Sequence, residues 1–193
     1  MTDILRPGSG ILFMKIGTHA REPLKDILAR KSKEIADAGY ALWGYGGNTC
    51  HPQSMVQPFA KTFERRGQAI YLCMQEMESS HRAEQVRADD YSADGSTWKP
   101  IPNEINVLGS RYALVIKELH KDEFDLPLAR TRVAIGNSQG RPGDRYISGR
   151  VDKACLEITG EQAEGSPEPG SLVHIGVVAE LIEPYAVYVR NRS

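Results

Sequence analysis

The sequence has few cysteines, and their spacing argues against disulfide bonds and against a structural metal site. The 193 residues include only Cys50, Cys73 and Cys155, and no two of them form a Cys-x-x-Cys pair. An odd number of widely separated cysteines indicates neither a disulfide framework nor a structural zinc site. We therefore expect a fold stabilised by its hydrophobic core, with no metal ligands and no cofactor.

Long apolar runs are also absent. No window approaches the roughly 18 apolar residues that a membrane-spanning helix requires, and the first ten residues, MTDILRPGSG, lack a basic region followed by an apolar one. Hydrophobic residues make up 40% of the chain and charged residues 25%, which is typical of a globular protein. These features predict a soluble cytoplasmic protein with no membrane partner.

No single sign of charge dominates the chain. Lys and Arg number 24 against 25 Asp and Glu, so the formal net charge is −1. Strong binding to duplex nucleic acid needs several unopposed cations that release counterions, so we do not expect it. The length fits one globular domain over 1–193, with a mobile surface loop at 161–170, and a homo-oligomer is compatible with this composition.

Hydrophobic patterning predicts more strands than helices. The expected strands are 10–17, 40–45, 69–77, 111–119, a short one from 131, 172–183 and 185–189, with 78–110 as a surface excursion and 120–130 as a connection. The expected helices are 22–39, a short one from Pro58 to Gly67, and 144–159. Because strands come in runs, the pattern favours a single-domain α+β fold with a mixed or mainly antiparallel sheet and two to three helices packed against it.

The helix expected over 144–159 depends on one apolar stripe. Its members recur at the spacing of one helical face and are Ile147, Val151, Ala154, Cys155 and Ile158. Gly160 would end this helix. Gly149 lies inside it and opposes the prediction, because an interior glycine costs about 1 kcal/mol relative to alanine.

The stretch WGYGGNTCHP at 43–52 follows an expected strand and combines aromatic rings with glycines. Glycine lets the backbone approach a ligand closely, and aromatic rings offer flat faces to a base or sugar. The candidate ligand-binding residues in this first glycine segment are Trp43, Tyr45, Gly46, Gly47 and Asn48. The alternative is a tight turn whose glycines serve backbone geometry alone, with the rings in the core.

A second glycine segment, GNSQGRPGDR at 136–145, has the strand, loop and helix-start order that lets backbone amides bind an anion. Six basic residues lie within 130–153 against two acidic ones. The planar guanidinium of arginine suits phosphate recognition. The candidate contacts here are Asn137, Arg141 and Arg145.

Acidic residues are concentrated in 76–94, where six face two basic ones. This segment could pair with the basic segment 130–153 across the surface, which would leave no site at either. It could also hold a divalent cation, but Asp89 and Asp90 lack the alternating oxygen spacing of a calcium loop. We assign no metal ligand on this basis.

The same first segment also supports a catalytic hypothesis. Cys50 precedes a proline-started turn, and a helix N-terminus can generate a thiolate nucleophile. His51 or His19 would be the acid or base. His19 would lie at the same end of the sheet as Cys50 if the strands 10–17 and 40–45 were parallel neighbours.

Two functions therefore remain open, and no motif anchors a resemblance to a known family. The favoured one is a binding protein that senses or sequesters a small anionic ligand, most plausibly a nucleotide or phosphorylated metabolite, without altering it. The alternative is a hydrolase or transferase that acts on such a ligand with Cys50 as nucleophile and a histidine as acid or base. Docking onto a macromolecule is a third possibility that no residue selects.

Overall fold

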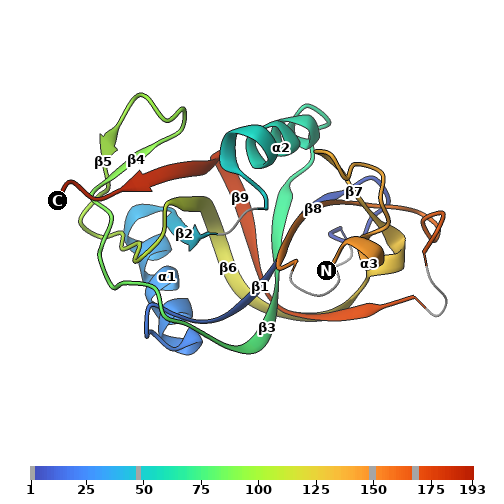
Figure 1. Cartoon of the computed structure of the whole chain (residues 1–193), viewed down its shortest axis with the longest axis horizontal. Coiled ribbons are helices and arrows are strands. Elements are labelled where there is room, and N and C mark those ends of the chain that lie inside the picture. The colour runs from blue at the N-terminus through green and yellow to red at the C-terminus, as the bar shows by residue number, and fades with distance from the viewer. Residues whose placement is uncertain (1–2, 47–48, 148–150, 167–169) are drawn as a thin grey trace.

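The computed structural model describes residues 3–46, 49–147, 151–166 and 170–193. Its strands form one nine-stranded sheet in the order β2-β6-β9-β3-β1-β8-β7, with β4 attached to β9 and β5 to β4 (Figure 1). The strands are β1 Gly10–His19, β2 Ala41–Tyr45, β3 Ile70–His81, β4 Asp90–Ser92, β5 Lys99–Pro100, β6 Tyr112–Pro127, β7 Thr131–Val133, β8 Lys153–Ile158 and β9 Leu172–Arg190. Among these strands, only β1 and β3 pair in parallel.

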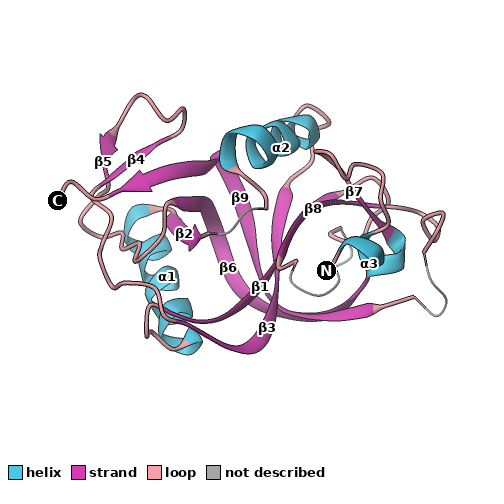
Figure 2. Ribbon diagram, in the orientation of Figure 1, coloured by secondary structure: helices cyan, strands magenta, loops and turns pink. Residues whose placement is uncertain are grey.

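Three α-helices accompany the sheet in the described residues, and Figure 2 shows them spread around the long curved strands. They are α1 Leu24–Ala38, α2 Gln57–Glu64 and α3 Gly143–Tyr146, with a π-helical turn at Pro52–Val56 and a 3-10 turn at Leu128–Arg130. The expected α+β class, with a mixed sheet and two to three helices, is confirmed.

Strand β1 divides the core because successive side chains point to opposite faces of a sheet. Leu12 and Met14 pack into a cluster with residues of α1 and α2. Ile11 and Phe13 pack into a second cluster on the other face, with residues of β8, of the C-terminal part of β6 and of the N-terminal part of β9. Helices α1 and α2 therefore lie on the same side of β1 as the aromatic residues of β2.

The helix expected over 144–159 is wrong. Helix α3 ends at Tyr146, and Lys153–Ile158 is the strand β8, which pairs with both β1 and β7. Ala154 and Leu156 enter one core cluster while Cys155 enters the other, so the apolar run follows a period of two. A short run that is apolar on both faces cannot be assigned from periodicity alone. Residues 148–150 lie outside the described part of the chain.

The connection expected at 120–130 is also wrong, because β6 continues to Pro127. Its pairing with β9 shifts register between Leu114 and Ile116, between Lys117 and His120, and between Lys121 and Phe124. Each irregularity interrupts the alternation by which a strand is identified. Likewise, β9 runs through Pro184 as one strand rather than two.

Two smaller expectations need correction. The first two strands are not neighbours, since β1 lies between β3 and β8 while β2 is at the edge beside β6. The regular helix begins at Gln57 rather than Pro58, after a π-helical turn that starts at Pro52.

Because β1 and β3 are the parallel pair, the C-terminal ends of these two strands meet at one edge of the sheet.

Candidate ligand-binding cavity

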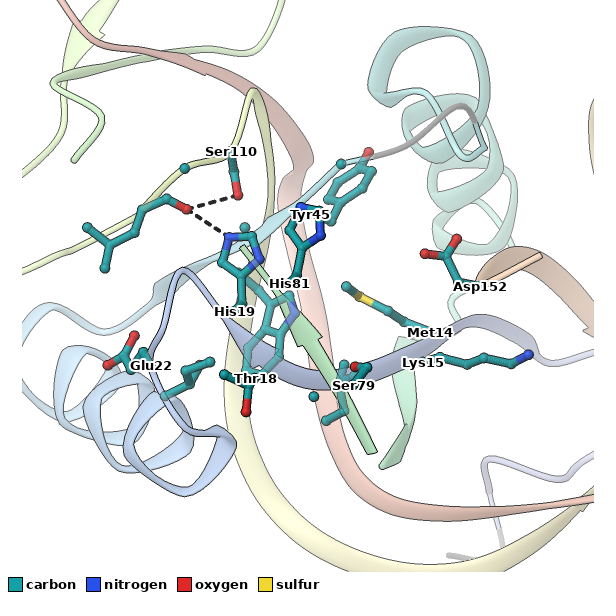
Figure 3. A pocket seen from close by; sticks show the side chains of 18 of the residues that line it. Met14, Lys15, Thr18, His19, Glu22, Tyr45, Ser79, His81, Ser110 and Asp152 are labelled. Carbon is teal, nitrogen blue, oxygen red and sulfur yellow. Dashed lines mark hydrogen bonds between the residues drawn. The ribbon is translucent and has the colours of Figure 1, made fainter. Parts of the chain in front are cut away.

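A cavity of about 570 Å³ opens where the ends of β1 and β3 meet β2 and α1. The connection 106–110 and residues 151–153 complete its wall. Figure 3 shows His19 and His81 beside each other, with Ser110 above His19, Glu22 toward one side of the view, and Asp152 and Lys15 toward the other. Its volume lies within the range of roughly 300–1,000 Å³ that small-molecule sites occupy.

The aromatic side of the cavity comes from β2. Trp43 and Tyr45 are two residues apart on this strand, so they share one face, and both are nearly buried while lining the cavity. The hydroxyl of Tyr45 donates to the carbonyl oxygen of Cys50 at 2.7 Å. Gly44 must be small because a Cβ there would lie 2.5 Å from Ser110 Oγ, whereas a Cβ on Gly46 would meet only open space.

Two histidines lie at the strand ends as direct partners. The register pairs Ile16 with Glu76 and Thr18 with Ser80, so three residues of β3 face Gly17 alone, and His19 then pairs with His81. Directly paired residues on neighbouring strands project from the same face, about 4.8 Å apart. Their rings stack with centroids 5.3 Å apart and planes inclined by 14°.

The two imidazole rings differ in burial and in hydrogen bonding. His19 is half-buried and its Nε2 donates to the carbonyl oxygen of Leu108 at 3.0 Å, which leaves Nδ1 as the acceptor of the neutral ring. Burial lowers the pKa of His19 below its ordinary value, and this outweighs the raising effect of the hydrogen bond to Leu108. His81 is exposed at the cavity wall.

A network of compensated charges lies at the α1 end. The guanidinium of Arg30 donates to Glu22 and Glu34, and Lys31 Nζ donates to Glu34 Oε2 at 2.8 Å. Both cations also donate to the carbonyl oxygen of Asn106 at 2.6 Å. Hydrogen bonds from Arg30 lower the pKa of Glu22, and burial lowers the pKa of Lys31 to about 8. These two cations and two carboxylates neutralise one another.

The opposite end holds a second neutral pair. Lys153 Nζ lies 2.9 Å from Asp152 Oδ2 and 6.0 Å from the centre of the Tyr45 ring. The side chain of Lys153 is only 7% exposed, and that of Asp152 is 49% exposed. Lys15 lines the same region, but its side chain runs away from the two histidines (Figure 3).

The cavity brings together four of the residues expected to form a site and leaves others elsewhere. His19, Trp43, Tyr45 and Gly46 line it. Cys50 is buried 3.8 Å from Cys155, sulfur to sulfur, and does not line it. His51 is exposed, and its Nε2 lies 3.0 Å from the hydroxyl of Tyr112. Gly47 and Asn48 lie outside the described residues.

The second glycine segment is not part of this cavity. Asn137, Arg141 and Arg145 are exposed and none of them lines the cavity wall. A Cβ on Gly136 would lie 2.9 Å from Met55 Cε, so the segment approaches the π-helical turn. Arg145 donates to the carbonyl oxygen of Gly165. The two glycine segments therefore do not converge on the same described cavity.

The acidic and basic segments also find other partners. Asp90 pairs with Arg190 at 3.3 Å and with Arg192. Arg132 pairs with Glu157 at 2.9 Å. Within the described residues no three His, Cys, Asp or Glu side chains are grouped closely enough to hold a metal ion. Asp90 of the acidic segment and Arg132 of the basic segment therefore each pair with a residue outside the other segment.

The sequence did not single out His81, Ser110 or Lys153, all of which line the cavity. A signal for His81 exists in the dipeptides Thr18-His19 and Ser80-His81, of which the first directly follows the expected strand 10–17 and the second follows the expected strand 69–77 after two residues. Ends of parallel strands meet at one edge of a sheet, where ligands often bind. No local signal marks Ser110, and Lys153 is marked only as one of the six basic residues of 130–153, because the position of each in the cavity depends on distant strands.

Comparison with family models, with curated proteins and with solved structures found no match to this chain. Among the helices in the described residues, none combines the length and the apolar character that a membrane crossing demands.

Proposed function

We propose that this protein binds a nucleotide, or a phosphorylated metabolite with a similar flat ring, in the cavity between β1, β2 and α1. The observation that carries the proposal is the convergence of Trp43, Tyr45 and the His19/His81 pair on one cavity of about 570 Å³. A cavity of this kind, largely apolar with a few directed polar groups, is the usual form of a small-molecule site.

The described lining supplies a flat ring and hydrogen-bonding groups. Trp43 lines the cavity, and no aromatic ring or cation of the described residues is stacked on it. Tyr45, by contrast, already contacts Tyr112 and lies under Lys153. A flat heterocycle would therefore contact Trp43, with the histidines and Ser110 offering polar contacts near the opening.

Binding without turnover is favoured over the Cys50 hydrolase or transferase. A nucleophile must reach the substrate and have a base within hydrogen-bond reach. Cys50 is 1% exposed, its nearest described thiol partner is Cys155, and it is not in the cavity wall.

The test is a thermal-shift screen against mono-, di- and cyclic nucleotides and phosphorylated metabolites, with each ligand then analysed by mass spectrometry. A ligand at about 100 times its dissociation constant adds roughly 2.7 kcal/mol to the free energy of unfolding, which raises the melting temperature measurably. Recovery of the ligand intact supports a binding protein. Recovery of a cleaved or modified ligand supports an enzyme instead.

The two tryptophans provide a matched control. Trp43 lines the cavity, whereas Trp98 does not. The guanidinium carbon of Arg190 lies over the Trp98 ring, 4.0 Å from the ring centre. Trp98→Phe leaves Trp43 as the single tryptophan and should retain both the ligand-induced thermal shift and a change in fluorescence. Trp43→Leu, shown to be folded by circular dichroism, should lose the thermal shift. Absence of any response to the whole panel would overturn the proposal and favour a macromolecular partner.

A further inference from the structure

Three of the cations that line the cavity are already matched by carboxylates. Arg30 and Lys31 pair with Glu22 and Glu34 at one end. Lys153 pairs with Asp152 at the other end. Lys15 points away from the histidines (Figure 3). An anionic group that enters near the histidines would therefore meet no uncompensated cation from these side chains.

The histidine pair is the part of the lining that can change this balance. Imidazole is the side chain whose charge ordinarily changes between about pH 5 and 8. His19 is held by its hydrogen bond to Leu108, and its burial opposes a positive charge. His81 is exposed and stacked on the His19 ring. A proton on His81 would thus reside at the cavity wall, against the face of a neutral aromatic ring.

We propose that the anionic group of the ligand binds at His81 and that binding takes up a proton on the His19/His81 pair. This inference rests on the proposed function, since it names how the same cavity accepts a negative charge. Protonated His81 would donate a hydrogen bond to a phosphate oxygen, and charge-assisted hydrogen bonds of this type are roughly twice as strong as neutral ones. Affinity for an anionic ligand then rises as the pH falls.

The other charged groups around the pair would modify this response without replacing it. Glu22, from the β1–α1 connection, favours a proton on His19, while Arg30 of α1 and His81 itself oppose it. Asp152 and Lys153 border the other end of the cavity and neutralise each other. Proton uptake is therefore expected at the exposed ring, with His19 as its stacking and positioning partner.

The experiment compares 3′,5′-cyclic nucleoside monophosphates of the four common bases with the matching nucleosides. A cyclic phosphodiester keeps one negative charge across the pH range used, so its own titration does not confuse the result. Isothermal titration calorimetry at pH 6 and pH 8, in buffers with different ionisation enthalpies, gives both the dissociation constant and the number of protons taken up.

We expect the cyclic nucleotide to bind about tenfold more tightly at pH 6 than at pH 8, with up to about one proton taken up. The nucleoside should bind equally at both values. His81→Gln should abolish the pH dependence of cyclic-nucleotide binding and the proton uptake. His174→Gln is the matched control, because His174 is exposed, pairs with Asp125 and does not line the cavity, and this variant should behave as wild type.

The outcomes separate the two proposals. Binding of the cyclic nucleotide with equal affinity at both pH values, without proton uptake, overturns the role of the histidine pair and leaves the proposed function standing. Unchanged pH dependence in His81→Gln overturns it as well. Failure of every cyclic nucleotide and nucleoside to bind overturns this inference, and the same result across the wider thermal-shift panel overturns the proposed function.

Discussion

The sulfur atoms of Cys50 and Cys155 lie 3.8 Å apart, although 105 positions separate the two residues in the chain. Cys50 lies near the end of the first glycine segment, and Cys155 is in β8. The Cys155 thiol donates to the sulfur of Cys50, and this hydrogen bond, together with burial, raises the pKa of Cys155. The contact joins the end of that segment to the core of the sheet and does not form a surface nucleophile.

The first prediction concerns thiol reactivity. All three cysteines are free and buried, and a buried thiol reacts slowly because the reagent is excluded. We expect none of them to react on mixing with dithiobis-nitrobenzoate at neutral pH, and all three to react in denaturant. The absorbance of the released thiolate measures this directly. A single fast thiol assigned to Cys50 by mass spectrometry would favour the catalytic hypothesis instead.

A glycine substitution should report on the bulge that positions the histidines. A Cβ on Gly17 would overlap Ser79 Oγ and lie 2.9 Å from the carbonyl oxygens of Met77 and Ser79. Overpacking of this kind typically costs about 1–3 kcal/mol, so Gly17→Ala should lower the midpoint of urea unfolding. Gly46→Ala is the control, because Gly46 lacks a positive φ and its Cβ would meet open space. Equal stability of the two variants would show that the bulge relaxes freely.

The buried pair Lys31 and Glu34 should respond asymmetrically to substitution. Both side chains are only 3% exposed. Glu34→Leu would leave Lys31 and Arg30 without their shared carboxylate, and breaking a buried pair from one side costs about 3–5 kcal/mol. Lys31→Met should be neutral or stabilising, since Glu34 keeps its hydrogen bonds from Arg30 and from the Asn106 amide. If urea unfolding showed the same loss of stability for Glu34→Leu and Lys31→Met, the expectation that burial of the lysine is itself destabilising would be wrong.

The same lysine predicts a dependence of stability on pH. Burial lowers the pKa of Lys31 to about 8 in the folded protein, whereas an unfolded lysine titrates near about 10.4. Between these values the unfolded chain binds the proton that the native state has released, so the free energy of unfolding should rise with pH. The gain approaches about 3 kcal/mol at about 1.4 kcal/mol per pH unit.

Lys31→Met provides the reference for that measurement. Urea unfolding of both proteins from pH 7.5 to 10.5 cancels the titration of other groups to first order, and the wild type should gain stability relative to the variant as the pH increases. A difference that stays constant with pH would mean that Lys31 keeps its ordinary pKa in the folded state.

The aromatic part of the cavity could be anticipated locally, but its partners could not. Trp43, Tyr45 and Gly46 follow one another closely in a strand and loop whose pattern is clear in the sequence. His81 reaches His19 only because β3 pairs in parallel with β1 after an irregularity at Gly17. Arg141 and Arg145 were predicted to contact the ligand because basic residues are dense around them. Charge density along the chain does not specify which cavity a side chain faces.

The sequence by itself determined the α+β class, the helix after the first strand and the strand that carries Trp43 and Tyr45, because these depend on local periodicity and on glycine and proline signals. Tertiary structure alone decided that 153–158 is a strand, that β6 continues through its polar half, and that Lys153 neutralises Asp152 beside the rings. Those outcomes depend on pairing between distant segments, whose hydrogen bonds and packing outweigh weak local preferences.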